Sequence, residues 1–587
     1  MRFVLAIVSF LLAALAIGAG IAQKTVFAAP DREVQSISLD STAPITVIDG
    51  TTLNAFPRSQ TVQLAGSTTA FAAYGRTTDV MGWIGDASYN TVSFSAGKGL
   101  VSTTTEAAES IVPSPAGSDL WLEEFPAEKA SKFTVNVPKD ISLIIVSDGT
   151  QPAPADITLS WRLDNDTPWA TPLVAAGGGL LLLGLVLLLW AITHLRRARG
   201  PRRKQPKMPK LPRQPRYKPS KQTRQRALPA TRGRRSTRTG MIAVPFVLVT
   251  ALSLGACSFA PTPEAQSPSP TPTPGADTTQ VAEPQQPAVT AAQATRIIAR
   301  VSAVAAKSDK ANNAKTLAAR FAGPALQRRI AAYKIHKVDK TIDPVTAVPS
   351  GPVALTLPGQ NDSWPRTVFA VIKGADETVP PLAVTMIQDD ARSQYKVHYS
   401  VALEPGIETP KVAKPSIGAP RLPVDVKLLT LAPESISKAY GDILVKGKKS
   451  KYYPMFEANG DSLRVEVGVE AKKQRVKKLP KTAKLTFANA PGTGQVVALA
   501  TIDAGAIVAV QLTETETVKP VQTGAAVSAP KDVKALLGKS LSTKGLRAVY
   551  ADQLLFYVPS ATVGGKIQLL GYSQGLVGAS ELKKAKK

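Results

Sequence analysis

The segment Gly571-Tyr572-Ser573-Gln574-Gly575 matches the G-x-S-x-G pattern that carries the nucleophile of many serine hydrolases. Such enzymes also need a helix after the serine and a later acid and histidine. Only twelve residues follow Gly575, none of them is histidine, and a helix over LVGASELKK would be too short to support a nucleophile. We therefore expect Ser573 to lie in a last β-strand that pairs with the segment DQLLFYV, and the motif to be a coincidence.

A second candidate is Asp164-Asn165-Asp166, which matches the Asp-x-Asp that holds a metal-bound sugar nucleotide in many glycosyltransferases. One such match is expected by chance in a chain of this length. The chain has three histidines, His194, His336 and His398, and a single cysteine, so a zinc site built from His and Cys is not expected. The sequence predicts no metal, no cofactor and no complete set of catalytic residues.

The positive charge of the chain is concentrated in one segment. The net charge is +28 over 587 residues, and residues 196–238 contain eighteen Lys and Arg without any Asp or Glu, which leaves about +10 elsewhere. Frequent prolines prevent a helix there, and only Tyr217 could stack on a base. We predict that residues 196–240 form a disordered cytoplasmic loop that attracts anionic lipid headgroups and binds no nucleic acid.

Two apolar segments flank residues 30–170 in the sequence. Residues 1–29 are either a signal peptide or a first transmembrane helix, since about twenty uncharged residues follow Arg2. Residues 171–195 are largely apolar and contain no Asp, Glu, Lys or Arg, so they predict a transmembrane helix, with Trp169 and Trp190 as anchors at the membrane interfaces. Because the basic loop follows this helix, the positive-inside rule places residues 30–170 outside the cell.

A third apolar stretch, residues 241–260, contains the only cysteine of the chain. Leu254-Gly255-Ala256-Cys257 resembles the lipobox of bacterial lipoprotein precursors, which implies a diacylglyceryl group on Cys257 and cleavage before it. The alternative is a third transmembrane helix in which Cys257 is a small apolar residue. Both interpretations export everything after residue 260.

The exported regions differ in their patterns. Residues 30–170 contain short alternating segments closed by glycines, which predict an all-β sandwich. Residues 261–288 are a Pro/Thr/Ser-rich linker. Residues 289–420 and 421–587 each begin with helical periodicity and continue with strands, so we predict two α+β domains with helices on antiparallel sheet. The predicted class is a multi-domain membrane protein: exported all-β sandwich, transmembrane helices, then α+β.

Short helices followed by a curved antiparallel sheet resemble the NTF2-like, cystatin-related fold. The whole arrangement also resembles uncharacterised actinobacterial membrane proteins with a lipoprotein-like C-terminal half, some of which are described as glycosyltransferases. These resemblances rest on architecture and composition, so they imply a location and a fold but no activity.

The sequence therefore predicts a membrane-anchored, extracytoplasmic envelope protein of a bacterium with a binding or scaffolding role. It would be a multi-pass protein of the cell membrane, with both large folded regions outside. Its expected partners are the lipid bilayer and either an envelope polymer or another membrane protein. The alternative is an envelope-acting enzyme, either a glycosyltransferase or a serine hydrolase.

Overall fold

The computed structural model describes residues 2–28, 30–67, 69–126, 130–163, 167–198, 286–342, 345–376 and 378–583. The chain forms two compact units. The first unit comprises Met1–Ile21 and Trp169–Val281, and the second comprises Ala22–Pro168 and Ala282–Lys587. Both large exported regions predicted from the sequence thus belong to the second unit.

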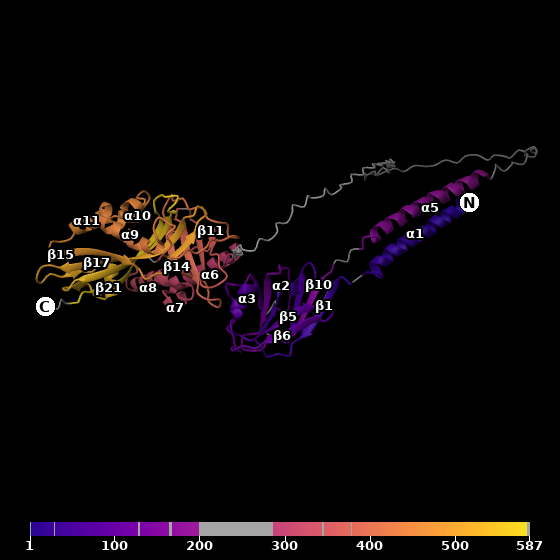
Figure 1. Ribbon diagram of the computed structural model, residues 1–587, viewed down its shortest axis with the longest axis horizontal. Coiled ribbons are helices and arrows are strands. Elements are labelled where there is room, and N and C mark those ends of the chain that lie inside the picture. The colour runs from indigo at the N-terminus through magenta and orange to yellow at the C-terminus, as the bar shows by residue number, and fades with distance from the viewer. Residues whose placement is uncertain are drawn as a thin grey trace, which may run out of the picture. The chain divides into compact units, whose positions relative to one another are not determined.

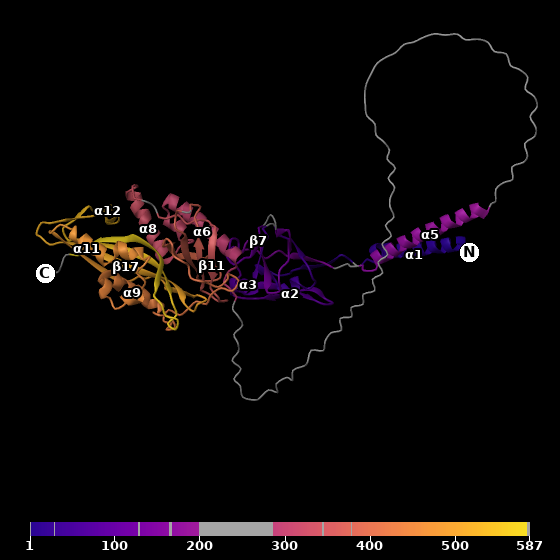
Figure 2. The same ribbon diagram turned by 90° about the horizontal axis from the view of Figure 1, so that it is seen from above.

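The first unit contains two long apolar helices, α1 (Arg2–Thr25) and α5 (Ala170–Ala198), which lie alongside each other in both views (Figures 1 and 2). Residues Phe3–Thr25 and Ala170–Arg197 are long and apolar enough to cross a membrane. Two candidate spans are therefore present at the predicted positions, as judged by length and composition.

Small residues allow α1 and α5 to approach closely. A Cβ added to Gly177 would lie 2.6 Å from Cγ1 of Ile17 and 3.0 Å from the carbonyl oxygen of Ala13. The Ser9 hydroxyl donates a hydrogen bond to the Leu180 carbonyl at 2.7 Å. Close backbone approach over glycine and alanine, with a hydroxyl bonded across the pair, is typical of helices that associate in lipid.

Residues 31–163 form two packed sheets. One sheet has the strand order β1-β10-β3-β8 and the other β6-β5-β2-β9-β4-β7, in which only β2 and β5 run parallel to each other. The strands are β1 (Arg32–Ser38), β2 (Ile45–Ile48), β3 (Gln60–Ala65), β4 (Phe71–Arg76), β5 (Tyr89–Ser95), β6 (Gly99–Thr105), β7 (Glu123–Phe125), β8 (Lys132–Val135), β9 (Ile141–Val146) and β10 (Asp156–Arg162).

The core between these sheets follows the alternation seen in the sequence. Ile157, Leu159 and Trp161 on β10 point inward, and the Trp161 indole donates to the Leu53 carbonyl at 3.0 Å. The prediction of a β-sheet domain here is confirmed. It omitted the two short helices α2 (Gly50–Leu53) and α3 (Thr77–Ile84), and α3 becomes important below.

The C-terminal region contains a single sheet of nine strands. The order is β11-β12-β13-β14-β21-β20-β17-β15, with β16 also paired to β17. The strands are β11 (Val353–Pro358), β12 (Arg366–Ile372), β13 (Leu382–Gln388), β14 (Lys396–Leu403), β15 (Ala483–Pro491), β16 (Val497–Ala500), β17 (Ala506–Pro520), β20 (Leu546–Val558) and β21 (Gln568–Glu581); β18 (Val527–Ser528) and β19 (Leu541–Ser542) form a separate ribbon.

This sheet crosses the boundary predicted at residue 420. Its two halves meet where β14 pairs with β21 through only two residue pairs, Ala402 with Tyr572 and Leu403 with Gly571. Each half retains its own helix-covered core, and alternate residues of both halves meet in a third core. The helix-then-strand order predicted for each half is present, but the two halves share one sheet.

Helices cover this sheet on both sides. Helix α8 contacts β14 and β21, α9 contacts β15 and β17, and the two helices lie on opposite sides of the strands (Figures 1 and 2). The helices of the first half are α6 (Ala291–Ala311), α7 (Ala314–Leu317) and α8 (Gly323–Val338). Those of the second half are α9 (Pro433–Lys446), η1 (Gly447–Lys449), η2 (Tyr453–Met455), α10 (Ser462–Val467), α11 (Val469–Lys477) and α12 (Lys531–Leu537).

Candidate functional site

The serine motif lies inside the last strand. Ser573 is half-buried in β21 opposite Gln553 of β20, so the predicted pairing with DQLLFYV is confirmed. The segment LVGASELKK is not a helix, because β21 continues to Glu581. A β-bulge shifts the register between the pairs Leu555–Gly571 and Phe556–Leu569 and leaves Leu570 as the extra residue. Continuous strand on both sides of Ser573 lacks the strand-to-helix turn that a hydrolase nucleophile requires.

The other predicted positions are dispersed. Asp164, Asp166 and Cys257 lie outside the described residues, as do residues 199–240 of the predicted basic loop and most of the linker. The first three residues predicted for that loop, 196–198, instead form the end of α5. Trp169 precedes α5 and is 67% exposed, while Trp190 lies within α5 and is 55% exposed.

The three histidines lie on separate elements. His194 lies in α5, and His398 lies on β14. His336 lies in the last turn of α8, with Nδ1 3.1 Å from the Ile342 carbonyl oxygen. His398 is half-buried rather than solvated, and burial lowers its pKa below the usual value, which favours the neutral ring. Within the described ranges, no group of three His, Cys, Asp or Glu side chains is placed to hold a metal ion.

A cluster of charges, all buried except the partly exposed Arg300, joins the β-sandwich to the C-terminal sheet. We call it the ionic joint and define it by two acids of the sandwich and three arginines of the C-terminal region: Asp79, Asp119, Arg300, Arg320 and Arg366. The acid and the arginine of each pair are about 180 to 290 positions apart in the sequence. The sequence pattern alone did not indicate that they meet.

Asp79, in the first turn of α3, is the centre of one half of the joint. Its Oδ1 accepts a hydrogen bond from Nη1 of Arg366 at 2.6 Å, and the Arg366 side chain has no exposed surface. Arg76 binds the other carboxylate oxygen at 2.9 Å and donates to the carbonyls of Pro287 and Ala288 at 2.7 and 3.0 Å. The C-terminal region is therefore tied to the sandwich at its start through Arg76 and at β12 through Arg366.

Asp119 is the centre of the other half. Its carboxylate accepts hydrogen bonds from Arg320, from Arg300 at 3.3 Å and from the backbone N–H of Tyr395 at 2.9 Å. The Asp119 side chain is fully buried and that of Arg320 is 8% exposed. Burial alone would lower the pKa of Arg300, but Glu124 and Asp119 beside it raise that pKa overall. The buried carboxylate thus has three donors, as a buried charge requires.

One face of α6 extends the contact. The spacing of Gln293, Arg296 and Arg300 places all three on the same side of the helix. Gln293 donates to the Leu120 carbonyl at 2.9 Å, and Arg296 donates to the Trp121 carbonyl at 2.7 Å. These bonds fix α6 along the loop that carries Asp119.

Apolar packing completes the joint around α3. The buried apolar residues of α3 belong to a second apolar core, which is separate from the core between the two sheets and contains Trp83. Ala391 and Trp364 of the C-terminal region pack into this second core. A Cβ on Gly82 would lie only 2.5 Å from the Trp364 ring, so the ring occupies the space left by this glycine. Arg392 donates to the carbonyls of Trp83 and Ile84 at 2.8 Å each and so satisfies the C-terminal end of α3.

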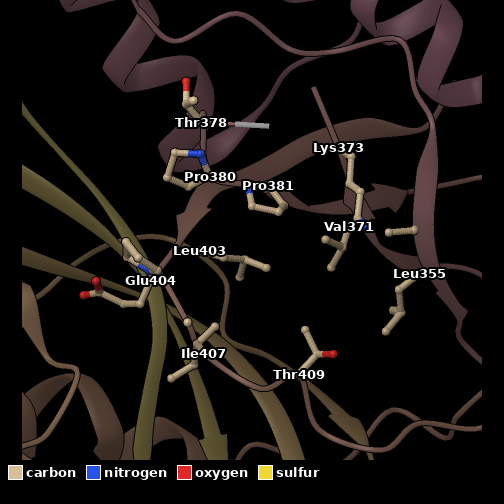
Figure 3. A pocket seen from close by; sticks show the side chains of 13 residues that line it. Leu355, Val371, Lys373, Thr378, Pro380, Pro381, Leu403, Glu404, Ile407 and Thr409 are labelled. Carbon is tan, nitrogen blue, oxygen red and sulfur yellow. The ribbon is translucent and has the colours of Figure 1, made fainter. Parts of the chain in front are cut away.

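A separate pocket of about 580 Å³ lies in the first half of the C-terminal sheet. Its walls are mostly apolar (Figure 3). The apolar lining comes from β11, β12, the residue before β13, the end of β14 and the loop after it: Leu355, Val371, Pro381, Leu403 and Ile407. The volume lies within the range of small-molecule pockets. We call this cavity the β14 pocket.

The carboxylate at the edge of this pocket is already engaged. Glu404 points away from Leu355 and Val371 (Figure 3) and accepts hydrogen bonds from the backbone N–H and the hydroxyl of Ser462 at 3.0 and 2.8 Å. Among the described residues that line the pocket, Lys373 is the other charged side chain. The pocket therefore suits an apolar group that carries a hydrogen-bond acceptor or a negative charge.

Sequence reasoning missed the joint because its signals are single residues in unremarkable contexts. Asp79 within TTDVMGWI is a first-turn acid that also suits an exposed helix, and Arg366 is the first residue of strand β12. The i, i+3, i+7 spacing of Gln293, Arg296 and Arg300 beside the apolar face of α6 was the strongest available signal.

Comparison with known proteins gives one family. No curated protein and no solved structure matches the chain. A family model described as "Domain of unknown function (DUF8094)" matches residues 285–581, which include all of the nine-stranded sheet and its helices. The match covers half of the chain, and the protein therefore belongs to the DUF8094 family.

Proposed function

We propose that the protein is a membrane-anchored scaffold of the bacterial envelope. In this proposal the β-sandwich and the C-terminal sheet act outside the cell as one rigid body that binds a partner. The ionic joint is the observation that carries the proposal, because two regions that share buried ion pairs lie on the same side of a membrane. The partner would be an envelope polymer or another membrane protein.

The joint also constrains the path of the chain. Helix α5 is apolar enough to cross the membrane after the sandwich, so the chain has to cross back before residue 286 for the joint to form. The apolar stretch 241–260 is the segment in this interval that can do so. This holds for a third transmembrane helix and for a lipid-modified Cys257, and in either arrangement residues 196–240 face the cytoplasm and its anionic lipids.

The packing of α1 on α5 supports a retained first span. A signal peptide that is removed has no need to fit a later helix, whereas Gly177 and Ser9 fit the two helices together closely. We therefore favour a transmembrane α1 over a cleaved signal.

We further propose that the two halves of the C-terminal sheet derive from a duplicated NTF2-like unit, since each half has its own helix-covered core.

The β14 pocket is our candidate for the partner site. To test location and binding together, Cys257→Ser removes the only cysteine, and Ile407→Cys then places a thiol in the pocket lining. A membrane-impermeant maleimide that carries a photoreactive group is added to intact cells and illuminated. We expect labelling without permeabilisation and a discrete cross-linked product.

Val563→Cys in the same background is the matched control. Val563 is 75% exposed and lies outside the pocket, whereas Ile407 is half-buried, so Val563→Cys should be labelled at least as readily but yield no discrete product. Labelling of both positions only after permeabilisation would refute the location. Labelling of both positions with identical, diffuse products would refute the pocket as a partner site.

A further inference from the structure

A second cavity, of about 860 Å³, lies in the other half of the C-terminal region. We call it the α9–α11 cleft, because the end of α9, η1, α10 and the start of α11 form it. Part of its wall is apolar and open to solvent: Val465 is 77% exposed, and Val445 and Val469 beside it are half-buried. An exposed valine within a concave apolar wall leaves surface that a ligand could cover.

The same cleft carries a positive charge. Its lining has five cationic side chains and two acids, Asp461 and Glu470, a difference of three positive charges. Lys473 pairs with Glu470 at 2.7 Å, and Asp461 accepts hydrogen bonds from Tyr440 and Arg464. The acids of the cleft are thus engaged with groups of the protein itself.

Three cationic groups retain capacity for an anion. Among the described residues, no carboxylate lies within ion-pair distance of Lys448 or Lys449. Arg464 uses Nε on Asp461 and Nη2 on the Glu457 carbonyl, while its Nη1 is buried without a hydrogen-bond partner among these residues. The Arg464 side chain is 14% exposed, so its positive charge, although not the buried Nη1 atom, acts on an anion in the cleft.

We propose that the α9–α11 cleft binds an anionic amphiphile, with its phosphate or carboxylate head at Lys448, Lys449 and Arg464 and its alkyl chain against Val445, Val465 and Val469. The cleft is large enough for such a molecule. The cationic side chains would bind the anionic head group of the ligand, and the valines would pack against its alkyl chain. This site is separate from the β14 pocket and goes beyond the scaffold function.

The test uses the full chain in phosphatidylcholine nanodiscs and a photoreactive hexadecyl phosphate as the probe. Peptide mapping after illumination should place the saturable adduct within residues 443–473. The double variant Lys448→Glu/Lys449→Glu should reduce this adduct about tenfold or more, because it replaces attraction of the head by repulsion. Val465→Asp, at an exposed position, should reduce it as well.

Lys477→Glu/Lys478→Glu is the matched control, since it makes the same charge change on exposed lysines outside the cleft. It should leave the adduct within about twofold of wild type. An adduct that maps elsewhere, or that both double variants reduce equally, would overturn the proposal. Equal competition by butyl phosphate and hexadecyl phosphate would overturn the alkyl part of it.

Two competition arms distinguish the sources of the ligand. If phosphatidylglycerol at about one fifth of the nanodisc lipid displaces the probe, the cleft takes an anionic lipid from the bilayer. If only added dodecyl phosphate displaces it, the cleft takes a soluble amphiphile. Both results support an anionic amphiphile site, whereas displacement by neither would contradict it.

Discussion

Replacing Asp119 by alanine is expected to lower the free energy of unfolding of the body formed by the β-sandwich and the C-terminal sheet by about 3–5 kcal/mol, because it leaves the buried Arg320 without its counter-charge. Asp119 is fully buried, and Arg320, which pairs with it, is 8% exposed. The substitution also removes the acceptor for the Tyr395 backbone N–H. Urea unfolding of the purified chain, followed by tryptophan fluorescence, measures the loss, and Trp83 and Trp121 lie in the core at the joint.

Glu109→Ala is the control for this prediction. Glu109 pairs with Arg392 across the same boundary at 2.8 Å, but its side chain is 44% exposed. Exposed pairs contribute about 0–1 kcal/mol, so this variant should unfold close to wild type. If the two variants lost the same stability, the buried charges would not be what holds the joint.

Asp552→Asn is expected to stabilise the protein at neutral pH, by about 1–3 kcal/mol. Asp552 on β20 has no exposed surface, and no donor among the described residues reaches either carboxylate oxygen with good geometry. Burial, and then the charge of Glu514, raise the pKa of Asp552 well above its usual value. Lys472 pairs with Glu514 at 2.7 Å, so its charge is already engaged.

The sign of the pH dependence follows from the raised pKa. In the unfolded chain Asp552 ionises above about pH 4, whereas the folded protein holds the proton to higher pH. Its contribution to stability is therefore complete at low pH and is lost as pH rises towards the folded pKa. The asparagine variant should exceed wild type in melting temperature at pH 8, and the difference should vanish near pH 4.

Asp376→Asn provides the opposite case. Hydrogen bonds from Thr378 lower the pKa of Asp376, so the ionised form contributes stability above the unfolded pKa. Its replacement should slightly lower the melting temperature at pH 8. A higher melting temperature for both asparagine variants at pH 8 would indicate that removing any negative charge stabilises the protein. The gain could then not be assigned to the buried carboxyl group of Asp552.

Local patterns in the sequence were sufficient for most elements of this fold. The alternation of Ile157, Leu159 and Trp161 predicted a strand, and the long apolar segments predicted α1 and α5. Such patterns arise because each element buries one face or is apolar on all sides. The last strand was also predicted, although its extension to Glu581 was not.

Long-range pairings could not be predicted in this way. The contact of β14 with β21 depends on Ala402 and Leu403 meeting residues about 170 positions away, and nothing local specifies it. The bulge at Leu570 reverses the alternation, so Tyr572 and Leu569 both pack in the α9 core although the simple pattern separates them. The ionic joint is of the same kind, since an acid and an arginine far apart in the chain give no periodic signal.

The central claim is that the joint holds the β-sandwich and the C-terminal sheet together without help from the connecting chain. A protease site inserted within residues 261–288 allows the purified full chain to be cut between α5 and α6. In about 0.5 M salt, which screens exposed charges far more than buried ones, the two fragments should elute together from a gel-filtration column. Arg366→Ala/Asp119→Ala should release the C-terminal fragment after the same cut. Separation of the fragments in the chain with an intact joint would contradict the account.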